Sequence, residues 1–437
     1  MRARQKQLTI RAGVILWATL LVFLPSVVTA CTTAVISGRA TVDGRPILWK
    51  NRDTSSRRNE VAFIEGGELR AIAVVNAGSR SSAWMGVNEA GFCIENSVSR
   101  DLKIEEKTSG PGNGGFMKLA LQTCRTVEEF RLLLEKTNTS GRSTVSNYGV
   151  IDAHGGAALF ETGPKSFKMF DANDPDIAPD GFLVRSNFAT TAQGVSPQPT
   201  LEELSEKTIV SADRFSQACT LLSSPDEAGI SIEYMIRNVC RDLSDTPGVP
   251  VCGSVNDPSG KLPEIINADS MISRTTTVSA AVFHGVKAGE DPLMTTMWAF
   301  LGDPKFSIAV PCWTSMSDIA SPLVGESEAP IGAIANTMRG WSFVDGGNGV
   351  DSTVLTGIWS DVWKVEDQIL SATAKARSKW ESKGGNPRDM NAVHMESARR
   401  SYHAMLTELR QLKNAALTIK TPAPPKFEPV TKTILVP

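Results

Sequence analysis

The boundary after residue 30 separates two different kinds of sequence and decides which residue begins the folded part of the chain. Basic residues at positions 2, 4, 6 and 11 precede an apolar run from Gly13 to Leu24, and Val28 and Ala30 follow. This order is typical of a secretory signal peptide. The apolar run falls short of the roughly 20 residues that a membrane helix needs, and no later segment is long and apolar enough to span. We therefore expect export to the periplasm or the extracellular space, with Cys31 first in the mature chain.

The residues after Cys31 have the composition of β-strands. Apolar and β-branched runs alternate with Gly, Asp and Asn, which favour turns. They predict antiparallel strands over residues 32–37, 46–49, 60–64 and 69–75. Residues 84–98 hold the sequence Asn-Glu-Ala-Gly between two short apolar runs, a pattern typical of a hairpin.

Further along the chain, strand and helix patterns alternate. Apolar residues at three- and four-residue spacings over 115–135 predict two helices broken near Thr126, and helices follow at about 209–223 and 230–243. Strands are predicted at 147–152, 156–161, 166–170, 181–187, 275–286, 295–301 and 306–310. Residues 355–417 predict a helical hairpin with a break at 382–388. This order is typical of sheets faced by layers of helices.

These patterns divide the chain into four parts. They are a signal peptide over 1–30, one main domain over 31–350, a C-terminal helical extension over 351–420 and a proline-rich tail over 421–437. The 45 basic and 47 acidic residues leave a net charge of −2, so nothing indicates binding to nucleic acid. Whether the chain forms an oligomer stays open.

Cysteine usage sets Cys31 apart. Seven cysteines in an exported chain leave one unpaired if the others form disulfides, and Cys31 is the natural odd one. The other six are sparse in so long a chain, so we expect at most one or two disulfides, with buried free thiols as the alternative.

A cysteine exposed by leader removal carries both a thiol and an α-amine, with ordinary pKa values of about 8.5 and 7.7–8.0. An amine that is substantially neutral near pH 7–8 can accept the thiol proton, so no histidine is needed for a nucleophile of this kind. The four histidines, His154, His284, His394 and His403, form no Cys/His motif. The sequence therefore indicates neither a metal nor another cofactor.

A second reading of Cys31 stays open at this point. Val28-Thr29-Ala30-Cys31 also resembles a bacterial lipobox, in which the cysteine is lipidated and its amine is acylated. The chain would then be a lipid-anchored binding protein without catalysis. Lipidated chains usually continue into a polar tether, whereas here a β-branched strand pattern begins at Thr32.

The segments Cys31-Thr-Thr-Ala-Val-Ile-Ser-Gly and Asp43-Gly-Arg-Pro-Ile-Leu-Trp-Lys-Asn-Arg-Asp53 resemble the penicillin acyltransferase-like branch of the N-terminal-nucleophile hydrolases. Its relatives include choloylglycine hydrolases, penicillin V acylases and dipeptidases. The resemblance implies an α+β fold, a four-layer αββα sandwich. It also implies that Cys31 is the nucleophile and that Asp53 orients its amino group. Lys50 stands where relatives usually carry Arg, so Arg52 is a second candidate for the supporting cation, with Asn51 between them.

Three later segments extend the resemblance. Gly86-Val-Asn-Glu-Ala-Gly-Phe-Cys-Ile-Glu-Asn96 implies an oxyanion-hole residue at Asn96, and Arg185-Ser-Asn187 implies that the Asn187 amide faces the tetrahedral intermediate. Ser211-Ala-Asp-Arg214-Phe implies an active-site arginine at Arg214. The implied reaction is attack of Cys31 on the linear amide of a small acyl-amide substrate, through a thioester that water or an amine resolves. The acyl group, the amine and the choice between this activity and that of a dipeptidase stay open.

Overall fold

The computed structural model describes residues 30–103, 108–207, 209, 211–225, 229–254, 257, 260–344 and 347–418. The predicted signal peptide, apart from Ala30, and the proline-rich tail lie outside these residues. All seven cysteines are free thiols in this structure. None of the helices in the described ranges combines the length and apolar character needed to cross a membrane.

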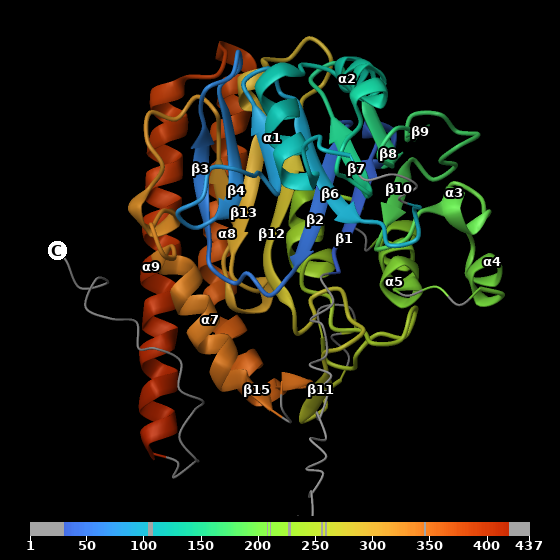
Figure 1. The fold of residues 1–437 in the computed structure, drawn as a ribbon. Coiled ribbons are helices and arrows are strands. Elements are labelled where there is room, and N and C mark those ends of the chain that lie inside the picture. Colours follow the sequence, from blue (N-terminus) through green and yellow to red (C-terminus); the bar gives the residue numbers. More distant parts are fainter. Residues whose placement is uncertain are drawn as a thin grey trace, which may run out of the picture.

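Two antiparallel sheets form the centre of the molecule (Figure 1). A six-stranded sheet has the order β10-β1-β2-β12-β13-β14, with bounds β1 Thr32–Ile36, β2 Ile47–Asp53, β10 Phe182–Arg185, β12 Thr277–His284, β13 Thr296–Leu301 and β14 Val310–Cys312. A seven-stranded sheet runs in chain order through β3 Asn59–Ile64, β4 Ala71–Asn76, β5 Met85–Asn88, β6 Cys93–Val98, β7 Ser146–Ile151, β8 Ala157–Thr162 and β9 Phe167–Asp171. A small third sheet joins β11 Ile265–Asn267, β16 Gly349–Asp351 and β15 Phe343–Val344.

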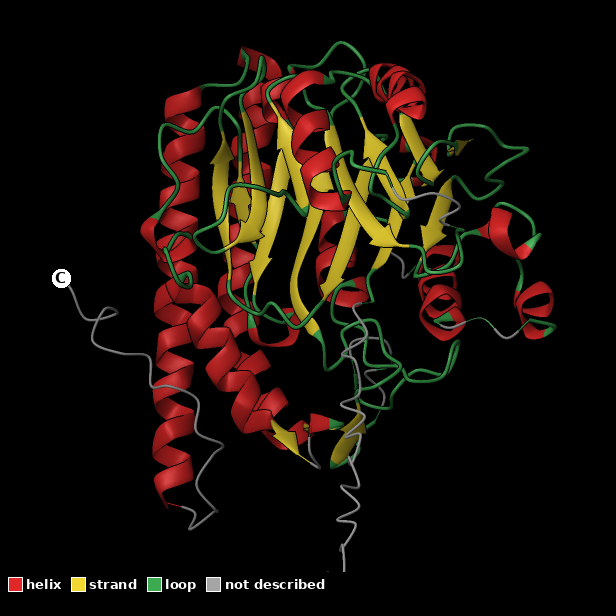
Figure 2. Cartoon of the chain, in the orientation of Figure 1, coloured by secondary structure: helices red, strands yellow, loops and turns green. Residues whose placement is uncertain are grey.

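The two large sheets pack face to face between layers of helices (Figure 2). Helices α1 (Asn113–Thr123) and α2 (Val127–Ser140) bury Phe116 and Phe130 against the outer face of the seven-stranded sheet. Helices α5 (Ala212–Ser223) and α8 (Ser352–Lys383) cover the outer face of the six-stranded sheet. The implied α+β, four-layer αββα sandwich is confirmed.

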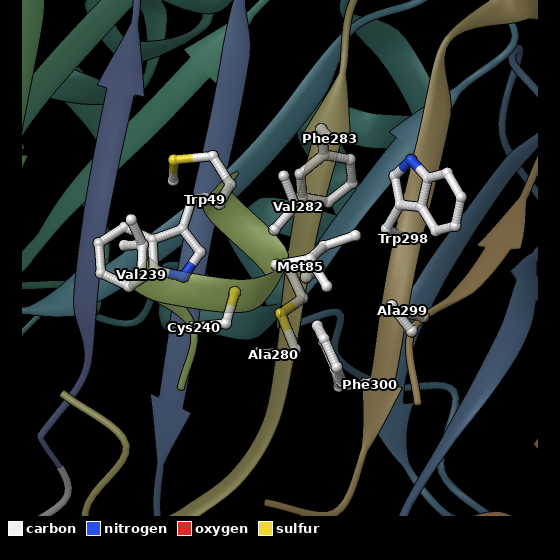
Figure 3. Close-up of a cluster of buried hydrophobic side chains, with 14 of the residues drawn as sticks. Trp49, Met85, Val239, Cys240, Ala280, Val282, Phe283, Trp298, Ala299 and Phe300 are labelled. Atoms are coloured by element: carbon white, nitrogen blue, oxygen red, sulfur yellow. The ribbon is translucent and has the colours of Figure 1, made fainter. Parts of the chain in front are cut away.

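The sheets approach most closely around Gly149 of β7. A Cβ atom at this position would lie 2.9 Å from side-chain carbons of Val35 and Leu48, on the facing sheet, and 2.2 Å from Glu95 Oε1. Only a residue without a side chain fits between them, because such contacts are far inside van der Waals distance. On the other face of β2, Trp49 packs beside Val239 and Cys240 (Figure 3).

The predicted helical hairpin is confirmed as α8 and α9 (Pro387–Thr418), with the chain reversing at Gly384, whose φ is +82°. Helix α7 (Pro330–Ser342), which we did not predict, packs against α9. The predicted helix at 230–243 is shorter, a turn α6 (Ile232–Tyr234) followed by a π-helical turn η2 (Met235–Val239). The remaining short elements are α3 Thr190–Gln193, α4 Leu201–Ser205 and the 3-10 turns η1 Gly38–Ala40, η3 Pro292–Met294, η4 Pro304–Phe306 and η5 Ser321–Leu323.

The predicted strand at 306–310 is wrong except at its last residue. Asp303 accepts a hydrogen bond from the Lys305 N–H and begins the turn η4, so that Phe306 belongs to a 3-10 helix and the strand β14 starts only at Val310. Proline after an Asp cap favours such a helical turn, because its φ is already set near the helical value.

Candidate active site

Cys31 lies at the start of β1, between β10 and β2, and only 8% of its surface is exposed. The preceding residue, Ala30, is also buried, and its N–H donates to the Asp53 carbonyl at 3.2 Å. This bond continues the β1–β2 pairing two residues beyond Thr32, the first residue of the strand. In this structure Ala30 is still joined to Cys31, so the Cys31 nitrogen is part of a peptide bond.

Charged groups approach Cys31 from both faces of the six-stranded sheet. Alternation along β2 sends Lys50 and Arg52 toward the seven-stranded sheet and Asn51 and Asp53 toward the opposite face. Negative charge on the Cys31 thiol interacts with Lys50 and Arg52 on the first face and with Arg214 on the second. The Cys31 side chain therefore has three buried cationic side chains around it.

Arg214 of α5 connects the parts of this site. Its Nη1 donates to the Cys31 carbonyl at 2.9 Å and to Thr32 Oγ1 at 2.6 Å. Its Nη2 donates to Asn187 Oδ1 at 3.0 Å, and Nη1 lies 3.9 Å from Asp53 Oδ2. Burial lowers the pKa of Arg214 and the charge of Asp53 opposes this. One guanidinium group thus joins four of the predicted site residues.

Asp53 is buried and has one oxygen without a hydrogen-bond partner. Oδ1 accepts a hydrogen bond from Thr277 Oγ1 at 2.7 Å, whereas Oδ2 accepts none from the described residues. Burial raises the pKa of this carboxyl to about 6, although Arg214 acts to lower it. Oδ2 is therefore an acceptor available to a new donor beside the Cys31 backbone.

Asn187 is fixed by three neighbours. Its side-chain nitrogen donates to the Val98 carbonyl at 2.8 Å, its side-chain oxygen accepts from Arg214, and its backbone N–H donates to Ser211 Oγ at 3.1 Å. One amide proton is committed to Val98. An asparagine side-chain amide has two N–H protons, so the second proton of Asn187 can donate to a ligand.

Asn96 contacts Lys50 instead of the cysteine. Lys50 Nζ donates to Asn96 Oδ1 at 2.8 Å and to the Trp84 carbonyl at 2.9 Å, while Asn96 Nδ2 donates to Ser146 Oγ at 2.9 Å. Both ends of the Asn96 amide are therefore occupied, and its visible role is to orient the lysine. Burial lowers the pKa of Lys50, and Cys31 and Glu95 oppose this shift.

The other two supporting candidates, Arg52 and Asn51, lie on opposite faces of β2 and contact different groups. Arg52 donates to Asn76 Oδ1 at 3.0 Å and lies 4.6 Å from the centre of the Trp84 ring; burial lowers its pKa to about 10. Asn51 instead donates to the Cys240 carbonyl at 2.9 Å and accepts from the Trp49 indole. Arg52 belongs to the cationic surroundings of the cysteine, whereas Asn51 ties β2 to the η2 segment.

Three residues of this site were not predicted. Thr277 orients Asp53 from β12, Ser211 holds the Asn187 backbone, and Glu95, whose pKa burial raises to about 8 against the opposing effect of Lys50, lies beside the lysine. No spacing in the sequence connects Thr277 to Asp53, because 224 residues separate them. Glu95 could have been noticed as the one charged residue of its strand.

No protein-family model and no curated protein matches this chain. Among solved structures, a Caenorhabditis elegans ortholog of N-acylethanolamine-hydrolyzing acid amidase matches at 13% identity and a TM-score of 0.37, covering 60% of this chain and 93% of its own. A variant of the conjugated bile acid hydrolase of Clostridium perfringens matches at 13% identity and a TM-score of 0.36, covering 62% and 89%. Penicillin V acylase of Agrobacterium tumefaciens matches at 13% identity and a TM-score of 0.35, covering 68% and 89%.

Because each of these TM-scores is below 0.5, the matches assign no function to this chain. The functional conclusion rests on the arrangement around Cys31.

Proposed function

We propose that this chain is an exported amide hydrolase or acyltransferase whose nucleophile is Cys31 after removal of residues 1–30. The observation that carries the proposal is the contact set of Arg214, which holds the Cys31 carbonyl and the Asn187 side chain and lies beside the Asp53 carboxylate. Buried charged side chains are retained in proteins where they are paired. A group of such side chains around a cysteine at the start of a strand has no evident role in folding by itself.

Cleavage of the Ala30–Cys31 bond would create the α-amine at the place where the Asp53 carboxylate has a free acceptor. Asp53 Oδ2 then accepts a hydrogen bond from the ammonium that forms when the amine takes the thiol proton. The thiolate sulfur attacks the amide carbonyl carbon, and negative charge moves to the carbonyl oxygen. Lys50, Arg52 and Arg214 interact electrostatically with Cys31 and are the cations nearest to the reacting sulfur that these interactions identify.

Collapse of the tetrahedral intermediate breaks the C–N bond. The leaving amine takes the proton back from the Cys31 ammonium, and a thioester remains on sulfur. Water, or a second amine, then attacks the thioester carbon and releases the acyl group. The unoccupied N–H of the Asn187 amide is our candidate for stabilising the oxyanion, a contribution of about 2.7–4 kcal/mol to the barrier when such a donor is aligned.

The lipid-anchor alternative fits this geometry poorly. Cys31 is 8% exposed and Ala30 is 2% exposed, and β1 continues directly into the middle of the sheet. A diacylglyceryl group on the sulfur would have to leave this position to reach a bilayer. A dipeptidase would use the same nucleophile, so the identity of the amide is a question of substrate.

The decisive test is the mass of the mature protein before and after incubation with a panel of chromogenic N-acyl anilides. We expect an N-terminus at Cys31, an acyl adduct on the Cys31 peptide and release of the chromogenic aniline. Cys31→Ala should remain folded and give neither adduct nor product. Cys252→Ala, which removes an exposed thiol, is the matched control and should behave like the parent protein. A diacylglyceryl mass on Cys31, or turnover by Cys31→Ala, would overturn the proposal.

A further inference from the structure

A cavity of about 530 Å³ lies at the other end of the six-stranded sheet from Cys31. Its floor includes Ile47 of β2 and Trp298 of β13, and one wall is α8, including Leu370, Ala374 and Arg377. Ile47 begins β2, whereas Cys31 precedes Thr32, which pairs with Asn51 near the end of that strand. The separation along the strand is roughly 15 Å or more at about 3.3 Å per residue, so the cavity is distinct from the candidate active site.

Three residues that line this cavity have a buried polar atom without a hydrogen-bond partner among the described residues: Trp298, Thr373 and Arg377. Trp298 is 3% exposed and Thr373 is 4% exposed, and neither Trp298 Nε1 nor Thr373 Oγ1 has a hydrogen-bond partner among the described residues. An unsatisfied buried donor costs about 1–3 kcal/mol, and native proteins pair nearly all such groups. An indole N–H can only donate, so the missing partner of Trp298 is an acceptor.

The cations that line the cavity are already used within the chain. Arg45 donates to Asp43, Glu290 and Glu381. Arg377 donates to the carbonyls of Met294 and Gly285 at 2.9 and 2.8 Å, and its Nε, which makes no hydrogen bond to the described residues, lies 3.6 Å from Glu381 Oε1. Both guanidinium groups therefore face acidic side chains of this chain, which opposes the binding of an anionic ligand.

The remaining charges of the lining are acidic. Glu233 and Asp367 line the cavity in addition to the acids that hold Arg45, and Asp367 accepts a hydrogen bond from Arg237 at 2.7 Å. His284, which contacts Asp43 at 2.8 Å, is neutral at pH 7 because burial lowers its pKa to about 4. The lining therefore disfavours negative charge, while Ile47, Trp298 and Leu370 provide apolar surface.

We propose that this cavity binds a small, largely apolar molecule that is neutral or positively charged, and that an oxygen acceptor on such a molecule strengthens the binding through the Trp298 indole N–H. Its volume is within the range of about 300–1,000 Å³ that small-molecule sites occupy. The site gives the C-terminal helix α8 a binding role in addition to its packing role. This inference does not depend on the chemistry of Cys31.

The test uses the full mature chain in the Cys31→Ala background and four probes with one shape: phenylbutanol, phenylbutylamine, phenylbutyrate and butylbenzene. Calorimetric titration should show binding of the alcohol and the amine. Phenylbutyrate should bind at least about tenfold more weakly, because like charges placed together are unfavourable. Failure of both the alcohol and the amine to bind, or tighter binding of the anion, would overturn the proposal.

Three variants test whether the probes bind in this cavity. Ala374→Phe places a ring into the cavity from the exposed side of α8 and should abolish binding, whereas Ala372→Phe, on the same helix but outside the lining, should leave it unchanged. Trp298→Phe should weaken phenylbutanol about 3- to 10-fold and leave butylbenzene unchanged, as expected for one hydrogen bond. Equal binding by Ala374→Phe and Ala372→Phe, or a crystal structure with the probe elsewhere and only water here, would refute the site.

Discussion

At the scale of single residues, the Asp53 carboxyl is the most informative titrating group of the site. Burial raises its pKa to about 6 while Ala30 is still attached to Cys31. In the proposed mature form, removal of residues 1–30 would create an ammonium group beside it, and a neighbouring positive charge lowers a carboxyl pKa. In the mature protein we therefore expect the Asp53 pKa to be at or below about 6.

This gives a prediction for the pH dependence of catalysis. As the pH falls through the Asp53 pKa, the carboxyl is protonated and no longer stabilises the ammonium, so kcat/KM should fall on the acid side of about pH 6. Thr277→Val removes a hydrogen bond to the charged form of Asp53 and should move this acid limb to higher pH. Asp53→Asn should be much less active and lose the limb. An unchanged acid limb in Asp53→Asn would exclude Asp53 as its source.

At the scale of elements, the start of α5 links helix geometry to the site. Ser211 is the N-cap of α5 and has φ +76°, and in the described part of the chain no other residue except glycine has a positive φ. Its hydroxyl accepts from the Asn187 N–H and donates to Ser186 Oγ at 3.0 Å. These bonds hold Ser211 in the left-handed region, which costs a residue with a Cβ roughly 1–2 kcal/mol.

Substitution of Ser211 should therefore invert the usual order of alanine and glycine. Both Ser211→Ala and Ser211→Gly lose the hydroxyl contacts, but only alanine keeps the steric cost of the positive φ. Ser211→Gly should be more stable than Ser211→Ala by about 1 kcal/mol in urea unfolding. Greater stability of the alanine variant would show that the backbone relaxes out of this conformation.

At the scale of the whole molecule, the C-terminal helices are part of the same hydrophobic core as the six-stranded sheet. Trp359, Val362 and Ile369 of α8 belong to the cluster that contains Trp49 and Phe300. A fully buried ion pair adds to this attachment, since Arg241 donates from both terminal nitrogens to Glu366 of α8 at 2.7 Å. Glu366 also accepts from the Ala309 N–H at 3.0 Å.

Breaking this pair from one side should destabilise the whole fold. Glu366→Gln leaves the Arg241 guanidinium buried without a negative partner, so we expect a loss of about 3–5 kcal/mol in the free energy of unfolding. Lys364→Ala, an exposed change on the same helix, should lie within about 0.5 kcal/mol of the parent protein. Denaturant titration followed by tryptophan fluorescence measures both. A Glu366→Gln variant as stable as the parent would mean that α8 is held by apolar packing alone.

The sequence alone determined the elements that depend on local signals. The β-branched run after Cys31 became β1, and Gly91, with φ +78°, reverses the chain in the predicted hairpin. The break near Thr126 is a helix start, where the threonine side chain accepts from the Glu129 N–H. Such features depend on residues within a few positions of each other, so alternation and capping patterns suffice to predict them.

Only the tertiary structure decided which of these elements meet. β2 pairs with β12, more than 220 residues later, and this pairing brings Thr277 to Asp53. The Arg214 contacts with Cys31 span 183 residues, and the Lys50–Asn96 contact joins the two sheets. Strand neighbours are selected by the burial of whole sheet faces, which no local pattern encodes. The sequence thus placed Cys31 at the start of a strand, and the packing of sheets and helices surrounded it with charge.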